Sequence, residues 1–398
     1  MRSKKIITIL GFLGLYFLSS GVSWAFFSYF GGGSTTQTQD QDGLAGERSK
    51  INLDLPRTEE CPINGMMYTK IEKSIWEDRR PITTVIENHL DARPTSGLSK
   101  ADVVYEAVAE GGITRFLGVF YCGVSADDVR IGPVRSARVY FVNWAAEYGV
   151  APLFVHVGGA NNICGQCPGG VKPKGTVGKE VDAFAMLSAL GWRYSSGNDL
   201  DGGTNVGFPV MWRDMERISG AAYEHTFMGS TDKLFNEGSD RGFGSKGWDE
   251  GYQSWKFADD SPSGSPSAAD ISFEFWSNKS DYDVNWKYDQ ASNSYLRSNG
   301  GTSYIDMEYK DLNVSAKNVV IQFVEEKGPV DREMHMYYEV VDRGEALIFQ
   351  NGSVIEGTWE KKAQTERTVF YDGEGEEVEF VRGVVWIEAV PIGNEIKY

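Results

Sequence analysis

The central part of the chain alternates short apolar runs with polar, glycine-rich turns. Runs rich in β-branched and aromatic residues predict four strands, at 82–87, 103–109, 113–121 and 152–157. Glu110-Gly111-Gly112 lies between the second and third runs and predicts a tight hairpin turn, because glycine reaches backbone angles that are closed to other residues. Glu110 and Arg115 would then face each other on opposite arms of the hairpin, where an ion pair is the favoured interpretation.

Helical periodicity appears in three places between residues 137 and 245. Apolar residues recur at 137, 140, 141, 144, 145 and 148, with Ser136 as the expected N-cap and Gly149 as the expected C-cap. Two further helices are expected at 181–190 and 231–237. Strands that alternate with helices predict an α/β domain over residues 58–245.

The pattern changes after residue 245, where short β-rich runs are broken by Gly, Asn and Asp turns. This segment shows no convincing helix, and it predicts a smaller β-rich domain over residues 246–398. Five of its aromatic residues are candidates either for the core or for a carbohydrate-stacking face, and the core is favoured: Trp276, Trp286, Tyr288, Tyr295 and Trp386.

The first residues form a different kind of segment. A basic tip at 1–5 precedes an apolar run at 6–30, which is long enough to cross a bilayer, since roughly 20 residues suffice. We expect an uncleaved signal-anchor with its N-terminus in the cytoplasm; a cleaved signal peptide is the alternative. The polar residues 31–57 predict a flexible linker. The protein is therefore expected in the cell membrane as a single-pass protein, with the bulk of the chain extracytoplasmic.

Charge and cysteine usage fit an exported protein. The net charge of −17 argues against a nucleic-acid partner, which requires a basic surface. The four cysteines are an even number, as is usual for disulfides in an oxidising compartment. The close spacing of Cys164 and Cys167 favours a local disulfide, which leaves Cys61 with Cys122. Free thiols, half of a zinc site or a redox pair are the alternatives.

Charged residues gather at the predicted strand ends and turns, and arginine predominates. Arginine holds a carboxylate or phosphate with two parallel hydrogen bonds, so a site here is expected to take an anion. The segment Gly132-Pro133-Val134-Arg135-Ser136-Ala137-Arg138 would place two arginines at a helix start. The candidate ligand-binding residues are Asn88, Arg93, Glu106, Glu110, Arg115, Arg135, Ser136, Arg138 and His156.

Each candidate also has a structural interpretation. Arg135 and Arg138 would pair with nearby acids such as Glu106, Glu110 or Asp102, and His156 would be a hydrogen-bonded core histidine. No metal-ligand spacing, phosphate-binding loop or nucleophile motif is present, so we expect no metal or cofactor and assign no catalytic residue.

Several unusual motifs resemble the YerB-type family of bacterial envelope proteins. They are IENHLDARPTSGLSKADVVYE, EGGITRFLGVFY, GPVRSAR and HVGG, followed by GTWEK at 357–361 and VVWIEAVP at 384–391. The resemblance covers roughly residues 75–395 and implies an envelope protein, lipid-modified or singly anchored, with an N-terminal α/β domain and a smaller C-terminal domain. It implies no activity, because the family has no established one. This chain lacks the cysteine to which such a lipid is attached.

Two function classes follow. The first is a binding or scaffolding protein of the envelope with an arginine-lined site for an anionic ligand or partner protein, tethered to the bacterial membrane by its N-terminal helix. The alternative is an envelope enzyme that acts on a phosphorylated or pyrophosphate-linked polymer precursor. In that case Asp102, Glu106 and Glu110 would hold a pyrophosphate through Mg²⁺.

Overall fold

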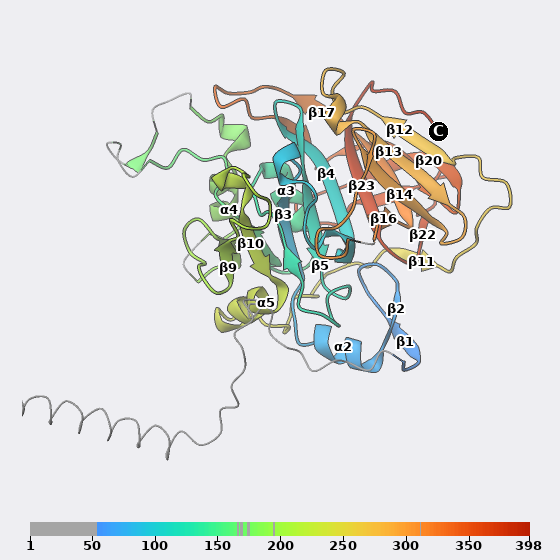
Figure 1. Ribbon diagram of the computed structural model, residues 1–398, viewed down its shortest axis with the longest axis horizontal. Coiled ribbons are helices and arrows are strands. Elements are labelled where there is room, and N and C mark those ends of the chain that lie inside the picture. The colour runs from blue at the N-terminus through green and yellow to red at the C-terminus, as the bar shows by residue number, and fades with distance from the viewer. Residues whose placement is uncertain (1–53, 165–166, 168–169, 173–175, 194–195, 311) are drawn as a thin grey trace, which may run out of the picture. The chain divides into compact units, whose positions relative to one another are not determined.

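The computed structural model describes residues 54–398, apart from residues 165–166, 168–169, 173–175, 194–195 and 311 (Figure 1). The expected cytoplasmic tip at 1–5, the expected transmembrane segment at 6–30 and residues 31–53 of the expected linker at 31–57 lie outside this part of the chain, and these predictions stay predictions. Among the described residues, no helix has the length and apolar character needed to cross a membrane.

The described fold begins with a small hairpin and a capped helix that the hydrophobic pattern did not predict. β1 (Arg57–Glu60) pairs antiparallel with β2 (Met67–Thr69), and α2 (Lys70–Trp76) follows directly. The Thr69 side chain accepts a hydrogen bond from the Glu72 N–H, and the Glu72 carboxylate accepts one from the Thr69 N–H. The spacing of Thr69 and Glu72 in this capping box is the sequence signal for the helix.

One eleven-stranded sheet forms the centre of the fold. From edge to edge its strands are β21 (Val369–Tyr371), β20 (Ser353–Glu360), β19 (Arg343–Gln350), β17 (Asn318–Lys327), β23 (Val385–Pro391), β4 (Val103–Glu110), β5 (Ile113–Phe120), β3 (Ile82–Glu87), β7 (Leu153–His156) and β8 (Asp199–Asp201), and β18 (Tyr337–Glu339) pairs with β17 beside this order. β4 and β5 form the predicted hairpin, and Gly111 and Gly112 both have positive φ.

The last strand, β23, joins the two predicted domains. It lies between β17 and β4 and runs parallel to both, with Glu388 opposite Glu106 (Figure 1). All of its residues are buried. The α-helices of the described residues lie in the first segment, as predicted. The boundary expected near residue 245 does not separate two sheets, however, because the chain end returns to complete the sheet that begins in the first segment.

Within the described residues, four smaller sheets accompany the central one. The first is the β1–β2 hairpin, and the second contains β6 (Arg130–Ile131), β10 (Phe227–Ser230) and β9 (Met211–Arg213). The third pairs β11 (Lys256–Ala258) with β22 (Glu379–Val381), and the fourth contains β12 (Asp270–Phe273), β13 (Val284–Asp289), β14 (Ser294–Asn299), β15 (Thr302–Ser303) and β16 (Ser315–Ala316). The β12–β16 sheet packs on β23 through Trp286 and Trp386, whose ring centroids lie 5.1 Å apart. Trp286, Trp386 and Tyr295 are core residues as favoured, and Trp276 and Tyr288 are partly buried.

The three predicted helices exist with shifted ends. They are α3 (Val139–Ala145), α4 (Ala183–Ala189) and α5 (Thr231–Asp240). Every residue of α3 is buried, so this helix is enclosed on all sides and not only on the apolar face that its periodicity predicts. α5 runs past the predicted end at Gly238, because this glycine lets the helix approach β7. A Cβ atom at Gly238 would lie 2.5 Å from a methyl carbon of Leu153. Short 3-10 helices occupy Leu90–Ala92, Leu98–Lys100, Lys179–Val181, Tyr223–His225 and Ser280–Tyr282.

A fully buried arginine links the central sheet to the β12–β16 sheet. Arg297 of β14 donates one guanidinium hydrogen bond to Glu388 of β23 at 2.7 Å and another to Glu106 of β4 at 2.5 Å. The three side chains have no exposed surface. Aromatic rings enclose the guanidinium carbon, at 4.8–5.7 Å from the centroids of Phe116, Trp286, Tyr304 and Trp386.

Protonation of Glu388 makes this burial tolerable. Burial, and next the neighbouring Glu106 carboxylate, raise the pKa of Glu388 well above its usual range. With Glu388 protonated, Arg297 balances the one remaining carboxylate. The Trp286 indole N–H donates to Glu388 at 3.0 Å, which supplies a further polar partner. A buried charge that is both paired and hydrogen-bonded avoids most of the cost of leaving water.

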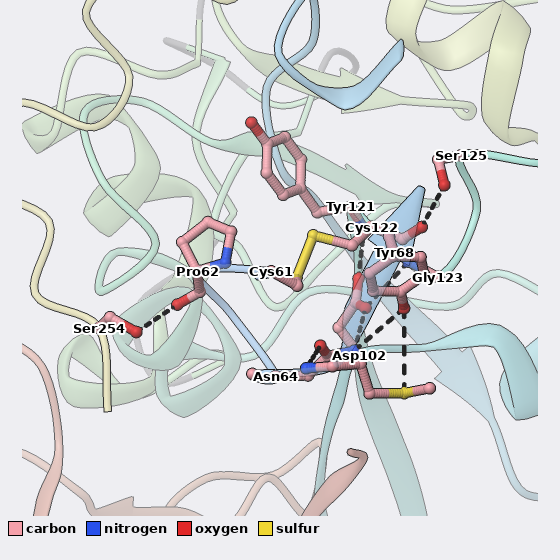
Figure 2. Close-up of a disulfide and its surroundings, with 12 residues drawn as sticks. Cys61, Pro62, Asn64, Tyr68, Asp102, Tyr121, Cys122, Gly123, Ser125 and Ser254 are labelled. Atoms are coloured by element: carbon pink, nitrogen blue, oxygen red, sulfur yellow. Dashed lines mark hydrogen bonds between the residues drawn. A yellow bond between two sulfur atoms is a disulfide. The ribbon is translucent and has the colours of Figure 1, made fainter. Parts of the chain in front are cut away.

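The two disulfides follow the pairing expected from spacing. Cys61 is joined to Cys122 and Cys164 to Cys167. Figure 2 shows the first bond beside Asp102, whose carboxylate accepts hydrogen bonds from the Asn64 side chain and from two backbone N–H groups that follow β5. Burial raises the pKa of Asp102 to about 7, against the lowering effect of these amides. The free-thiol and zinc alternatives are wrong for this structure, because both require reduced cysteines.

Replacing Arg297 should destabilise the protein strongly. Arg297→Met would leave two buried acidic side chains, Glu106 and Glu388, without the guanidinium that they share, and we expect a loss of about 3–5 kcal/mol in the free energy of unfolding. Urea unfolding followed by tryptophan fluorescence measures this loss. Arg382→Met is the control, because Arg382 pairs with Glu60 and Asp259 at the partly exposed surface and should cost at most about 1 kcal/mol. Equal losses for the two variants would show that the buried contact is not special.

The disulfides should contribute unequally to stability. Cys61 and Cys122 are 61 residues apart, whereas Cys164 and Cys167 are separated by 3. A longer closed loop restricts the unfolded chain more, so alanine replacement of the first pair should cost about 4 kcal/mol and of the second about 1–2 kcal/mol. Urea unfolding of the two double variants tests the order, and mass spectrometry of the non-reduced digest tests the linkage. A larger loss for the Cys164–Cys167 variant would contradict this account.

Candidate functional site

The segment that carries two of the candidate arginines fills a split in the central sheet. β3 and β7 run parallel and pair over Ile82–Thr84 and then separate. Residues 133–137 lie between them. The Arg135 N–H donates to Val85 of β3 at 2.9 Å, and the Arg135 carbonyl accepts from Val157, just after β7, at 3.1 Å. The carboxyl ends of parallel strands are where open α/β sheets bind ligands, and this segment lies there.

Three arginines meet two glutamates at this position. Arg115 and Arg138 both donate to Glu110, the second at 2.5 Å, so one carboxylate at the hairpin turn holds two guanidinium groups. The Arg135 Nε lies 2.5 Å from Glu87 Oε2, and the Arg115 Nε lies 3.9 Å from Glu87 Oε1. We call these five residues the arginine cluster. The pairing of Glu110 with Arg115 across the hairpin is confirmed.

The arginine cluster carries more positive than negative charge. Burial alone would raise the pKa of Glu87, but the hydrogen bond from His225 and the charges of Arg115 and Arg135 lower it to about 2. Burial alone would also raise the pKa of Glu110, but the charges of Arg115 and Arg138 lower it to about 2. Both acids are therefore ionised at neutral pH. Three permanent cations face two anions, which leaves one positive charge unbalanced within the cluster.

Some N–H groups of these arginines have no hydrogen-bond acceptor among the described residues. The Arg115 side chain is 2% exposed, and its Nη1 has no hydrogen-bond partner within the described part of the chain; the same holds for Nε of Arg138. The cluster nevertheless reaches the surface, since the side chains of Arg135 and Glu110 are 22% and 31% exposed. Buried charged donors are costly when they remain unpaired, so an anion that enters beside Arg135 would be stabilised here.

Ser136 does not have the role predicted for it. The extended pairing of residues 133–137 continues through Ala137, whose N–H donates to Gly158, so α3 begins only at Val139. Arg138 occupies the N-cap position and makes no side-chain capping bond. Ser136 instead donates to the Val157 carbonyl at 3.2 Å. The prediction of a helix-terminal anion site capped by Ser136 was therefore wrong, and Ser136 is not part of the arginine cluster.

Asn88 and Arg93 lie beyond β3 and connect it to the β12–β16 sheet. The Asn88 amide donates to Thr114 at 2.7 Å and to Asn299 of β14 at 3.1 Å. Arg93 donates to the Asn88 side chain at 2.9 Å and to the Asp281 carbonyl at 2.8 Å. These contacts place both residues in the connection between the sheets, beside the arginine cluster and outside its ion pairs.

His156 belongs to a separate buried set of contacts. Its Nε2 contacts Asp199 and its Nδ1 lies 2.6 Å from the Gly158 carbonyl, so both ring nitrogens face acceptors. Burial alone would lower the pKa of His156, but the Asp199 carboxylate raises it overall. Arg193 completes the set by donating to Asp199 at 2.6 Å and Asp201 at 2.9 Å. This is the hydrogen-bonded core histidine of the structural interpretation.

The three acids considered for Mg²⁺ have different partners. Glu106 accepts a hydrogen bond from Arg297, and Asp102 accepts from backbone amides beside the Cys61–Cys122 disulfide. Glu110 accepts from Arg115 and Arg138 within the arginine cluster. Asp102 and Glu106 have no exposed surface. Each carboxylate is therefore already committed to a set of donors of its own.

Glu87 of the arginine cluster and the neighbouring His225 were not among the sequence candidates. Glu87 ends β3 and holds Arg135, and His225 places its Nδ1 3.3 Å from Glu87 Oε2. His225 also lies against His89, with ring centroids 4.6 Å apart. An acid at the last position of a buried strand, as Glu87 is, was the sequence signal available for the first of them.

Comparison with known proteins places the chain among relatives without an assigned activity. Residues 68–243 match the profile described as "Protein of unknown function (DUF3048) N-terminal domain", and residues 271–387 match its C-terminal domain. The "Putative lipoprotein YerB" of Bacillus subtilis (strain 168) is 30% identical over 336 residues, which are 83% of this chain and 86% of that protein. The crystal structure of YerB from Bacillus subtilis matches with a TM-score of 0.65 at 26% identity, over 86% of this chain and all of that one.

The acids of the arginine cluster should make stability depend on pH. The pKa of Glu110 is about 2 in the folded protein and near 4.5 when unperturbed, so its contribution is full above pH 4.5 and is lost as the pH falls towards 2. Glu110→Gln should therefore cost about 1–2 kcal/mol of unfolding free energy at pH 6 and less at pH 3. Urea unfolding at both pH values measures the difference. A cost that does not change with pH would mean that the Glu110 charge does not stabilise the fold.

Proposed function

We propose that this chain, which belongs to the DUF3048 family, is a membrane-tethered, extracytoplasmic binding or scaffolding protein of the bacterial cell envelope. The arginine cluster would be its site for an anionic ligand. The relative named as a lipoprotein supports the envelope location. This chain has no cysteine before Cys61, so we propose that the apolar run at 6–30 supplies the membrane tether that a lipid would supply elsewhere.

The observation that carries the proposal is the unbalanced charge of the arginine cluster. Glu87 and Glu110 account for two of its three guanidinium charges. Donors of Arg115 and Arg138 remain without acceptors among the described residues, although both side chains are almost fully buried. Because the ion pairs hold the guanidinium planes in place, a bound anion would pay little to order them.

A carboxylate or phosphate group fits these donors best. Guanidinium groups bind planar or tetrahedral oxyanions through paired hydrogen bonds, and they remain charged at every physiological pH. Entry beside Arg135 would give the anion one partly exposed arginine and two buried ones. The enzyme alternative gains no support from the placement of Asp102 and Glu106, because both are fully buried with other partners. It stays a prediction of the sequence.

Titration calorimetry of the full-length chain in non-ionic detergent tests the proposal. The probes are inorganic phosphate, pyrophosphate and a muropeptide with free carboxylates. We expect saturable binding of at least one probe, weakened by salt, because part of the attraction is between exposed charges. Arg135→Gln should weaken this binding about tenfold or more, since it removes a charged hydrogen-bond donor from the site.

A second variant separates loss of charge from loss of structure. Glu110→Gln raises the positive excess of the arginine cluster and should tighten anion binding, whereas damage to the fold would weaken it. Arg382→Gln is the matched control, because Arg382 pairs with two acids of its own, Glu60 and Asp259. The proposal fails if none of the probes binds the folded protein, or if Arg135→Gln and Arg382→Gln have the same effect.

A further inference from the structure

Three metal-ligating side chains from distant parts of the sequence meet next to the arginine cluster. His89 caps the 3-10 helix Leu90–Ala92 that follows β3, Asp91 lies within that helix, and His225 ends the 3-10 helix that precedes β10. One ligand atom of each of the three side chains lies within 4.8 Å of those of the other two. Such a separation is wider than in an occupied site, and side-chain rotations would close it.

Local contacts hold the first two of these ligands. The His89 Nδ1 accepts a hydrogen bond from the Asp91 N–H at 3.2 Å and so caps the 3-10 helix Leu90–Ala92. The same nitrogen lies 3.7 Å from a carboxylate oxygen of Asp91. The two side chains thus face the same small volume, and Asp91 can swing towards it because its side chain is 65% exposed.

His225 is held more firmly, by a carboxylate behind it. The His225 side chain is 7% exposed, and its Nδ1 lies 3.3 Å from Glu87 Oε2. A carboxylate behind one imidazole nitrogen fixes the ring and leaves the other nitrogen free to bind a metal, which is the arrangement found around most metal-bound histidines. Glu87 would thus serve both the arginine cluster and His225.

The two imidazole rings lie against each other. Their centroids lie 4.6 Å apart with planes inclined by 13°. Because an imidazole nitrogen binds a metal in the plane of its ring, the more exposed His89 ring would rotate out of this stack to share an ion with His225. His89 is 31% exposed, so an ion can reach the pair from solvent.

We propose that His89, Asp91 and His225 bind one divalent transition-metal ion of the Zn²⁺ class. Two imidazole nitrogens and one carboxylate oxygen suit Zn²⁺ and its first-row neighbours, whereas Mg²⁺ and Ca²⁺ prefer oxygen ligands alone. Three protein ligands leave a coordination position open to water or to an oxyanion. The proposal does not depend on anion binding by the arginine cluster, although a metal here would add positive charge beside Arg135.

A second grouping of ligand-type residues does not compete with this site. Cys61, Asp102 and Cys122 also lie within 4.8 Å of one another. Their two sulfur atoms are joined in a disulfide and are therefore unavailable as thiolates.

Titration of the untagged full-length chain with Co²⁺ and Zn²⁺ tests the proposal. Co²⁺ should give a visible absorption band that saturates at one equivalent and disappears when Zn²⁺ is added. Zn²⁺ should raise the Tm of the wild-type protein, and Mg²⁺ at the same concentration should not. His225→Gln and His89→Gln should each weaken Co²⁺ binding about tenfold or more, as loss of a metal ligand requires.

His335→Gln is the matched control, because His335 lies 2.8 Å from Asp331 but has no second histidine beside it. This variant should bind Co²⁺ like the wild type. If His225→Gln fails to fold, His89→Gln and the exposed Asp91→Asn carry the test. Absence of the Co²⁺ band in the folded wild type, or unchanged binding in folded His89→Gln and Asp91→Asn, would overturn the proposal.

Discussion

The contact on which the structure depends is the buried arginine between two glutamates. Arg297 comes from the β12–β16 sheet, Glu106 from the first segment of the chain and Glu388 from its last strand. Removing three such groups from water is tolerable only if their charges and hydrogen bonds nearly balance. This requirement fixes the register of β23 beside β4 and places the second sheet against both, so the two family domains share one core.

The arginine cluster follows from the same sheet. Once β4, β5 and β3 are in register, Glu110, Arg115 and Glu87 lie at one end of the sheet. The separation of β3 from β7 then admits the segment that contains Arg135, and its backbone pairing on both sides sets the direction of its side chains. The candidate site is thus built from short connections on a rigid base, and β4, which carries Glu110, also carries Glu106 of the buried contact with Arg297.

Local features could be predicted from the sequence, and distant contacts could not. The Gly111-Gly112 hairpin, the Cys164–Cys167 bond and the presence of three helices each depend on a few neighbouring residues. Nothing near Arg297 in the sequence indicates its partners, because they lie in strands that meet only in the folded sheet. Ser136 precedes an apolar repeat, as an N-cap would, but strand-like pairing extends past it. The transmembrane prediction concerns residues outside the described structure.

The central claim is that both segments form one cooperative unit joined through β23. Native-state hydrogen exchange tests it most directly, because it reports the opening free energy of each strand separately. The account predicts that core amides of β4, β14 and β23 exchange with one common free energy, equal to that of global unfolding. Exchange of β14 and β23 at a clearly lower free energy than β4 would show that the C-terminal segment opens on its own, which would contradict the account.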